Sequence, residues 1–259
     1  MKVATFNVNS IRNRLEVILR WMQDNKADML CLQETKCQDK DFPVDAIKEA
    51  GLNCAFCGQK TFNGVALVSP HELTDVSTGA ENPVTGKEAR FISARVGDVL
   101  FVNTYIPMGQ EKGTDKFEFK LEFLDYMREY FAGLLQAENI VWCGDFNIAL
   151  TDMDLYEPDA HRGGVCFCEE EQTRLRSIME LGLSDTYRQL WPDAEKAFTF
   201  WDYRIPAAVR RGMGWRLDYI MASQAVADTL TASWIDKEVR MQPKPSDHTL
   251  LISEFNYNL

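Results

Sequence analysis

The sequence lacks any long hydrophobic run, any N-terminal targeting signal and any low-complexity segment. Its longest stretch without a charged side chain is Val99 to Gln110, twelve residues, whereas a membrane-spanning helix needs about 20 apolar residues. No basic segment followed by an apolar core stands at the N-terminus, so nothing indicates secretion. We therefore expect a cytoplasmic protein without a membrane partner, folded as one domain over residues 1–259. We also expect it to be a monomer.

The sequence also lacks a disulfide framework, because its seven cysteines are odd in number and irregularly spaced. Free thiols of this kind fit a reducing compartment. Cys54 and Cys57 form a C-x-x-C pair, but their apolar surroundings are typical of a strand, in which residues three apart point to opposite faces. A structural zinc site is therefore not expected there, nor at Cys166 and Cys168.

Positive charge is scarce: 28 Lys and Arg residues stand against 39 Asp and Glu residues, a formal net charge of −11. Proteins that bind DNA by neutralising phosphates usually carry excess Lys and Arg, so charge alone argues against a DNA partner. Site carboxylates that hold a divalent cation would weaken this argument, because the cation would contact the phosphate. Basic residues also gather locally, at Arg12 and Arg14, at Lys112, Lys116 and Lys120, and at Arg204, Arg210, Arg211 and Arg216.

Short apolar runs alternate with helical patterns along the chain, which predicts an α/β fold. The runs Val3–Phe6, Asp28–Leu32 and Ile140–Cys143 are typical of buried strands. The apolar spacing from Ile11 to Met22 predicts a helix with Asn9 or Ser10 as N-cap.

Two further helices are predicted in the second half of the chain. Apolar residues from Phe117 to Leu134 recur at helical spacing. The acidic run Glu169–Glu171 favours a helix N-terminus, and Gly182 would end that helix. The two halves of the chain thus repeat one pattern, a strand that ends in Asn or Asp, a helix, and a strand that carries an acid. Two packed mixed sheets flanked by helices accommodate this pattern, and a single doubly wound sheet is the alternative.

Short oxygen-bearing side chains stand at the ends of the apolar strands, where α/β folds usually place a functional site. They are Asn7, Glu34, Asp145, Asn147, Asp218 and Asp247. Each one alone could cap a turn, but six together favour a metal site. Oxygen-only ligands suit a hard ion, Mg²⁺ or Mn²⁺, rather than zinc.

Only three histidines occur in the sequence. His71 and His161 lie in polar, loop-like surroundings, and we expect both to be exposed. His248 follows Asp247 and precedes a strand-like run, so it is a candidate for proton transfer or for stabilising phosphate charge. The alternative is a structural histidine whose hydrogen bonds are all satisfied.

Five motifs occur in a fixed order along the chain: Phe6-Asn7-Val8-Asn9, Leu32-Gln33-Glu34-Thr35-Lys36, Gly144-Asp145-Phe146-Asn147, Trp215-Arg216-Leu217-Asp218-Tyr219 and Ser246-Asp247-His248. Together they resemble the exonuclease III and class II apurinic/apyrimidinic endonuclease family, and the resemblance extends over essentially the whole chain. The resemblance implies a four-layer α/β sandwich of two packed mixed β-sheets flanked by helices. It also implies Mg²⁺-dependent hydrolysis of double-stranded DNA at abasic sites or at 3′ ends during base excision repair.

The resemblance also implies roles for individual residues. Glu34 would be the principal metal ligand, with Asp247 and Asn9 or Asn7 close by. Asp145 would orient or deprotonate the attacking water, and Asn147 would help to fix the water or the phosphate. His248, oriented by Asp218, would stabilise the scissile phosphate, and Tyr105 would support the phosphate or the leaving oxygen.

A DNA-binding surface is implied in the same way. Phe200, Trp201, Trp215 and Leu217 would wall a pocket for an extruded abasic sugar, although an aromatic core cluster is an equally good interpretation of Phe200. Arg12, Lys36 and Arg90 would touch or approach DNA phosphates. Flipping is easiest where no base remains to unstack, which would give lesion selectivity.

Three positions depart from the family pattern. Met108 stands where Asn or Gln is usual, Ala89 replaces a glycine before Arg90, and Thr249-Leu250 follows the histidine in place of a small residue and proline. They leave open whether abasic-site incision, 3′ exonuclease or removal of 3′ blocking groups dominates. Two other functions share parts of the pattern: a phosphoinositide or sphingolipid phosphatase with the same metal chemistry, and a DNA-binding module without catalysis.

Overall fold

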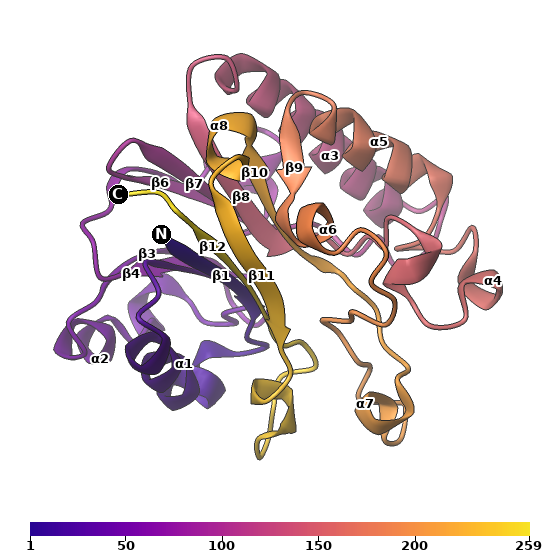
Figure 1. Ribbon diagram of the computed structural model, residues 1–259, viewed down its shortest axis with the longest axis horizontal. Helices are drawn as coiled ribbons and strands as arrows, with labels where there is room; N and C mark the ends of the chain where they lie inside the picture. Colours follow the sequence, from indigo (N-terminus) through magenta and orange to yellow (C-terminus); the bar gives the residue numbers. More distant parts are fainter.

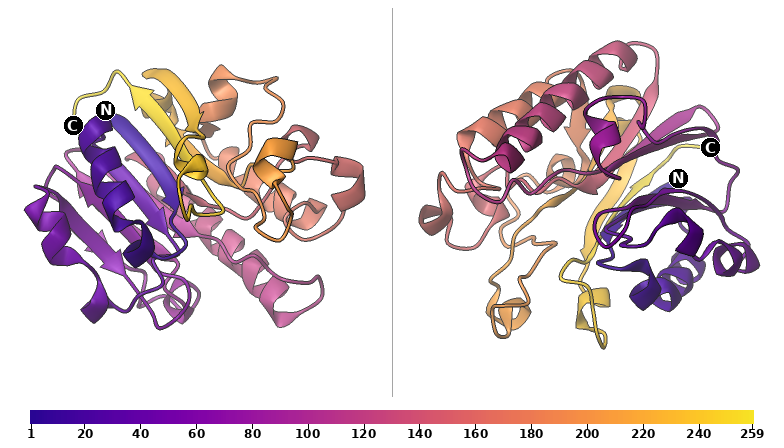
Figure 2. Two further views of the ribbon diagram at one scale, coloured as in Figure 1. Left: turned by 90° about the horizontal axis from the view of Figure 1, so that it is seen from below. Right: turned by 180° about the vertical axis from the view of Figure 1, so that it is seen from behind.

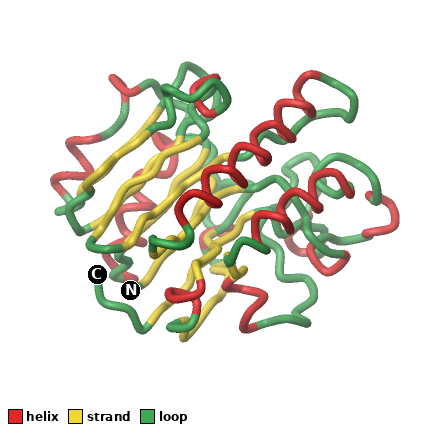
Figure 3. Tube along the Cα trace, turned by 90° about the horizontal axis from the view of Figure 1, so that it is seen from above, coloured by secondary structure: helices red, strands yellow, loops and turns green.

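Two mixed six-stranded sheets pack face to face in the computed structural model, which describes residues 1–259 (Figure 1). Helices cover the outer face of each sheet, and the views from other sides show the same layers (Figures 2 and 3). The expected four-layer α/β sandwich is therefore confirmed, and the alternative of a single doubly wound sheet is wrong. None of the helices is long and apolar enough to cross a membrane.

The two sheets share one pairing pattern, in which a single parallel pair stands at the centre between antiparallel neighbours. In the first sheet the order is β11 (Leu230–Asp236), β12 (Leu250–Phe255), β1 (Lys2–Asn7), β2 (Met29–Gln33), β4 (Val65–Ser69) and β3 (Asn53–Cys57). In the second it is β5 (Thr74–Ser77), β6 (Phe91–Val96), β7 (Val99–Tyr105), β8 (Asn139–Asp145), β10 (Asp218–Ser223) and β9 (Leu183–Asp185). The repeat expected from the sequence is present only in its first half. Strands β1 and β2 form a parallel pair, but β8 and β10, which were expected to correspond to them, are antiparallel, and the parallel pair of the second sheet is β7/β8.

The core lies in three apolar layers, because most central strands are buried on both faces and so have continuous apolar runs. Residues such as Val3, Phe101 and Val141 pack between the sheets. On the outer face of the first sheet lie α1 (Ile11–Asn25) and α2 (Val44–Glu49), and on that of the second lie α3 (Asp115–Leu134) and α5 (Glu169–Met179). The remaining helical segments are short: α4 (Pro158–His161), α6 (Thr186–Leu190), α7 (Ala208–Arg211), α8 (Gln224–Ala227), and the 3₁₀ turns η1 (Asp39–Asp41), η2 (Thr85–Lys87), η3 (Asp152–Asp154) and η4 (Val239–Met241).

The predicted N-cap of helix α1 is confirmed in position, although its side chain does not cap the helix. Ser10 occupies the N-cap position with φ of 92°, and its side chain makes no capping hydrogen bond. The backbone N–H groups of Ser10 and Ile11 instead donate to the carbonyl oxygens of Glu34 and Thr35, at 2.8 and 3.0 Å. The loop after β2 therefore satisfies the start of α1, which leaves the Asn9 side chain free to contact other groups.

One edge of the sandwich collects polar side chains from both sheets. Strands β1, β2, β7 and β8 end at this edge, and β10 and β12 begin there because they run antiparallel to β8 and β1. Just inside this edge, Gln33 of β2 donates from Nε2 to Asn103 Oδ1 of β7 at 2.7 Å, and Asn103 Nδ2 donates to the carbonyl of Leu32 at 2.9 Å. These buried bonds fix the separation of the two sheets beside the polar edge.

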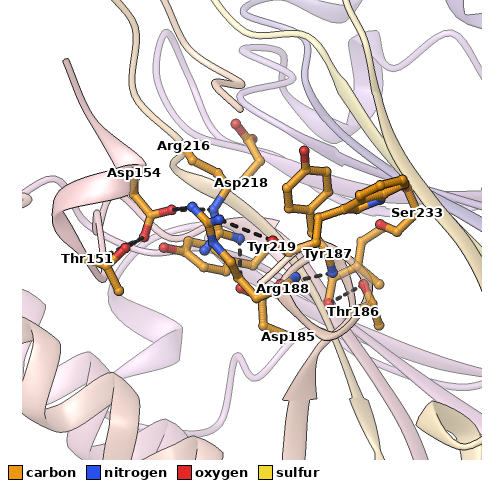
Figure 4. Close-up of polar contacts among 12 residues, drawn as sticks. Thr151, Asp154, Asp185, Thr186, Tyr187, Arg188, Arg216, Asp218, Tyr219 and Ser233 are labelled. Carbon is orange, nitrogen blue, oxygen red and sulfur yellow. Dashed lines mark hydrogen bonds and ion pairs between the residues drawn. The ribbon is translucent and has the colours of Figure 1, made fainter. Parts of the chain in front are cut away.

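A buried ion network joins η3 to the starts of β10 and α6 (Figure 4). Arg216 donates from Nε to Asp154 at 2.7 Å and from Nη1 to Asp185 at 2.7 Å, and Arg188 reaches Asp154 at 2.6 Å. The Arg216 guanidinium also lies 4.4 Å from the ring centroid of Tyr219. Arg216 is fully buried, so its place in a basic surface cluster was wrong: its charge is balanced inside the protein.

We predict that this network makes the fold sensitive to acid. Burial would raise the pKa of Asp154, but the charges of Arg216 and Arg188 lower it to about 2. Relative to an unfolded value of about 3.9, this difference contributes about 2.5 kcal/mol of folding free energy. Because the pKa is depressed in the folded state, the contribution is present above pH ~4 and is lost as the pH falls toward ~2.

The measurement is urea unfolding of the native protein and of Asp154→Asn at pH 7 and at pH 3. At pH 7 the substitution should cost about 3 kcal/mol, because it leaves Arg188 without a charged partner and Arg216 with Asp185 alone. At pH 3 the difference should be clearly smaller. An equal difference at both pH values would contradict the assignment.

Candidate active site

A cavity of about 700 Å³ opens at the polar edge, between the strand ends and the loops that carry α4 and α7. Its lining combines carboxylates, amides and a histidine from both sheets with aromatic and apolar side chains from the loops. The lining residues are Glu34, Tyr105, Met108, Asp145, Asn147, Tyr156, His161, Val165, Cys166, Phe200, Asp202, Tyr203, Arg204, Ile205, Met213, Trp215, Leu217, Asp247 and His248.

Asn7, at the end of β1, connects the two sheets at the base of this cavity. Its Nδ2 donates to Glu34 Oε1 at 2.8 Å and to Asp145 Oδ2 at 2.9 Å. Its Oδ1 accepts the backbone N–H of Asn9 at 3.1 Å, which fixes the orientation of the amide. Asn7 therefore presents its NH₂ group to the two carboxylates, and this geometry does not support the alternative in which its oxygen binds a metal.

Glu34 lies in the loop after β2 with φ of 52°, and its side chain is 17% exposed. Lys36 Nζ contacts Glu34 Oε2 at 2.6 Å and Asn9 Oδ1 at 2.7 Å, and Asn9 Nδ2 donates to Asp247 Oδ1 at 3.0 Å. Burial would raise the pKa of Glu34, but the hydrogen bond from Asn7 and the contact with Lys36 lower it. Glu34 thus remains an ionised oxygen donor at the cavity wall.

The donor set fits a hard divalent cation. Glu34 and Asp247 line the cavity with carboxylate oxygens. Lys36 and Asn9 link them, because Lys36 Nζ contacts both Glu34 and Asn9, and Asn9 Nδ2 donates to Asp247. Such oxygen ligands are those that Mg²⁺ and Mn²⁺ prefer. Glu34, Asp247 and Asn9 would hold the metal.

Asp145, at the end of β8, is buried and held on both carboxylate oxygens. Oδ2 accepts from Asn7, and Oδ1 accepts the backbone N–H of Asn147 at 3.0 Å. Burial raises the pKa of Asp145 to about 7, against the charge of His248, which lowers it. A carboxyl group whose pKa lies near neutrality can accept and release a proton under ordinary conditions.

His248 stands between two carboxylates from the other sheet. Its Nδ1 lies 2.8 Å from Asp218 Oδ2, and its Nε2 lies 3.6 Å from Asp145 Oδ2. Burial would lower the pKa of His248, but the charges of Asp218 and Asp145 raise it to about 10. One ligand atom from each of these three residues lies within 4.8 Å of the other two. A protonated imidazole cannot ligate a metal, however, so this triad is better suited to proton transfer and to binding an anion.

Tyr105, at the end of β7, lines the cavity beside Glu34 and Asp145. Burial, followed by the charges of these carboxylates, raises the pKa of Tyr105 well above its ordinary value. Its hydroxyl therefore stays protonated and can donate a hydrogen bond. The Arg90 guanidinium lies over the Tyr105 ring, 4.5 Å from its centroid.

The expected aromatic wall is present, with one exception. Phe200, Trp215 and Leu217 line the cavity, and the Phe200 ring centroid lies 4.9 Å from that of His248. Trp201 does not line the cavity: it is 2% exposed and packs against Phe198 and Ala208. Neighbouring residues in an extended segment point to opposite sides, so only Phe200 of this pair can face the cavity.

The three basic residues expected near DNA differ in their surroundings. Arg12 is exposed on α1, and Lys36 lies within the site. Arg90 is mostly buried, because it pairs with Glu88 and donates to the carbonyl of Tyr105 at 3.2 Å. Met108, which replaces the usual amide, lines the cavity and is 48% exposed. The charge of Arg90 is therefore paired with Glu88 inside the protein, and its guanidinium contacts Tyr105.

His161 is a site residue that sequence reasoning missed. It was expected to be exposed, but it lines the cavity with its ring edge-to-face on Trp215, at a centroid distance of 4.9 Å. Its Nε2 is buried and has no hydrogen-bond partner. His71 forms a partly buried pair with Asp28 at 2.9 Å, remote from the cavity. No spacing in the sequence signals the difference, since both histidines lie in polar segments.

Comparison with known proteins gives consistent findings. A sequence profile of the endonuclease/exonuclease/phosphatase family matches residues 4–248. The DNA repair nuclease APEX1 of Danio rerio is 31% identical over 253 residues, which cover 96% of this chain and 80% of the relative. An AP endonuclease from Archaeoglobus fulgidus has a TM-score of 0.95 and 37% identity, with 99% of this chain and 100% of that chain covered. A 3′ phosphatase from Neisseria bound to a product DNA hairpin has a TM-score of 0.94 and 34% identity, with the same coverage.

Proposed function

The chain belongs to the endonuclease/exonuclease/phosphatase family, and we propose that it is a magnesium-dependent DNA repair phosphodiesterase that incises abasic sites and processes 3′ ends. The observation that carries this proposal is the pairing of Asp145 with His248 across the two sheets, with Nε2 and Oδ2 3.6 Å apart at the cavity. Glu34 is attached to the same pair through Asn7. A candidate general base (Asp145), a candidate cationic side chain (His248) and a candidate metal ligand (Glu34) are thus connected at the cavity.

The reaction would be attack of water on a phosphodiester. Asp145 is the group to orient and deprotonate the water, because its pKa of about 7 allows it to take a proton near neutral pH. Asn147, held next to it, would fix the water through its side-chain oxygen. No covalent intermediate with the protein is required.

Two donors would stabilise the negative charge that develops on the phosphoryl oxygens. His248 carries a positive charge in the pair with Asp218, and Tyr105 keeps its hydroxyl proton. Donors that are already oriented in a buried site stabilise a transition state more than water does. A cation held by Glu34, Asp247 and Asn9 would supply Lewis-acid stabilisation of the phosphate and of the leaving oxygen.

The aromatic and apolar lining of the cavity is consistent with a substrate whose sugar is extruded from the duplex. Phe200, Trp215 and Leu217 form an apolar part of the cavity lining, and the cavity of about 700 Å³ is of the size that holds a small ligand. An abasic sugar can rotate out of the duplex without unstacking a base, so it would enter this pocket most easily. The similarity to a DNA repair nuclease in sequence and to an AP endonuclease in fold supports DNA as the substrate over a phospholipid.

Cleavage of a duplex that contains one abasic analogue is expected to require a divalent metal, since the site carboxylates would otherwise repel the phosphodiester. EDTA should abolish cleavage, and Mg²⁺ or Mn²⁺ should restore it, with no improvement from Zn²⁺. Glu34→Gln should raise the Mg²⁺ concentration needed for half-maximal rate. Cleavage that persists in EDTA would exclude the hydrolytic scheme. Binding without cleavage would indicate the non-catalytic module, and hydrolysis of phosphoinositide or sphingomyelin alone would indicate the lipid phosphatase.

Asp145→Asn should lower turnover by roughly two to four orders of magnitude, because it removes the base. Burial already penalises the ionised carboxylate, so the melting temperature should stay at or above that of the native protein. His248→Asn should lower turnover by a similar factor, and it should also lower the melting temperature because Asp218 loses its partner. Single-turnover rates and thermal melts check both variants. A rate for Asp145→Asn close to the native rate would remove Asp145 from the mechanism.

Trp215→Ala should harm abasic-site incision more than removal of an ordinary 3′-terminal nucleotide, since only the internal lesion must be held outside the helix. Trp201→Ala is the matched control, because Trp201 has the same side chain but lies in the core. It should cost about 3–5 kcal/mol of stability and leave the ratio of the two activities unchanged. Both rates and the melting temperature are measured for each variant. Equal losses of the two activities in Trp215→Ala would show that Trp215 does not shape the pocket.

A further inference from the structure

Lys120 is a buried lysine whose charge the mechanism does not use. It lies in the second turn of α3 with a side-chain exposure of 0%, although the sequence placed it in a basic cluster with Lys112 and Lys116. Its Nζ donates to the carbonyl of Asn147 at 2.8 Å and to that of Met108 at 3.2 Å. A fully buried ammonium is costly, so these contacts need a reason.

Glu171 of α5 is the partner of this lysine. Its Oε1 lies 3.0 Å from Lys120 Nζ and also accepts the backbone N–H of Cys166 at 3.1 Å, and its side-chain exposure is 0%. Met108, Asn147 and Cys166 all line the cavity. The ion pair therefore ties together three loops that form one side of the site.

Asn147 is the residue in which these contacts converge. It has a left-handed backbone with φ of 51°, a conformation that asparagine tolerates better than most residues. Its N–H donates to Asp145, its Nδ2 donates to the carbonyl of Ile106 at 3.0 Å, and its own carbonyl accepts from Lys120. The side-chain oxygen Oδ1 is the one polar group of Asn147 that no other group in the protein binds, so it is available to the cavity.

We propose that the Lys120–Glu171 pair is a positioning device that holds Asn147 so that its side-chain oxygen accepts a hydrogen bond from the attacking water. This inference rests on the proposed hydrolytic function. Neither residue touches the substrate: both act through the backbone of the loop. Stability alone is a poor explanation, because a buried ion pair is often no more stabilising than apolar residues of the same volume.

The first test separates position from stability. Lys120→Met alone leaves Glu171 as a buried, unpaired carboxylate and should lower the melting temperature. The double variant Lys120→Met/Glu171→Gln removes both charges, keeps the side-chain sizes, and retains a side-chain oxygen on α5 that can accept the backbone N–H of Cys166. Its melting temperature should recover, whereas kcat on the abasic duplex should stay about 10- to 100-fold below the native value. KM and the Mn²⁺ dissociation constant, measured by calorimetry, should not change.

Leu175→Ala is the control on the same helix. Leu175 is buried in the core beneath α5 and does not line the cavity, so its truncation should lower the melting temperature and leave kcat unchanged at 25 °C. Recovery of kcat together with stability in the double variant would overturn the proposal.

A double-mutant cycle then asks whether Lys120 acts through Asn147. In an Asn147→Ala background the positioned side chain is absent, so the Lys120 and Glu171 substitutions should cause almost no further loss of kcat. An additional loss as large as that in the native background would overturn the proposal. A native protein that cleaves no DNA would instead refute the proposed function. In that case a crystal structure of the double variant decides the positioning, because Asn147 should lose its hydrogen bond to Ile106 if the proposal holds and keep it if the proposal is wrong.

Discussion

The side-chain amide of Asn7 is the constraint on which the site depends. Its NH₂ group bonds Glu34 from the first sheet and Asp145 from the second, and a backbone N–H fixes its orientation. The separation of the sheets beside it is set by the buried bonds between Gln33 and Asn103. A small change in sheet packing would therefore move the candidate metal ligand relative to the candidate base. Because packed cores resist such changes, the geometry is fixed before any substrate arrives.

Much of the positive charge near the site is used inside the protein. Arg216 neutralises Asp154 and Asp185 behind the wall, Lys120 neutralises Glu171 under Asn147, and His248 is held between two carboxylates. Such internal cations contribute little to a phosphate-binding surface. The net charge of −11 is thus compatible with a DNA substrate only if contacts to the backbone are few and a metal carries part of the neutralisation.

The two sides of the cavity are supported by different networks. The side of the cavity that contains Asn147 and Met108 contacts the Lys120–Glu171 pair on α3 and α5, because Lys120 donates to the backbone carbonyls of both residues. The apolar side, with Trp215 and Leu217, flanks Arg216, whose ion pairs anchor this segment to η3 and α6. Substitutions in one network can therefore change one side of the site while leaving the other in place.

The sequence by itself determined the fold class and the set of groups at the site. Apolar runs that end in Asn7, Glu34 or Asp145 specify strands whose ends can bear a site, and the ordered motifs identify the family pattern. Only the tertiary structure decided which groups face the cavity. Closeness in the sequence grouped Lys120 and Arg216 with other basic residues. The motifs did not separate Trp201 from Phe200, and the polar surroundings did not separate His161 from His71. The reason is physical: burial and charge balance depend on partners that are distant in the chain, such as Glu171 for Lys120 and Asp154 for Arg216, and no local pattern encodes such contacts.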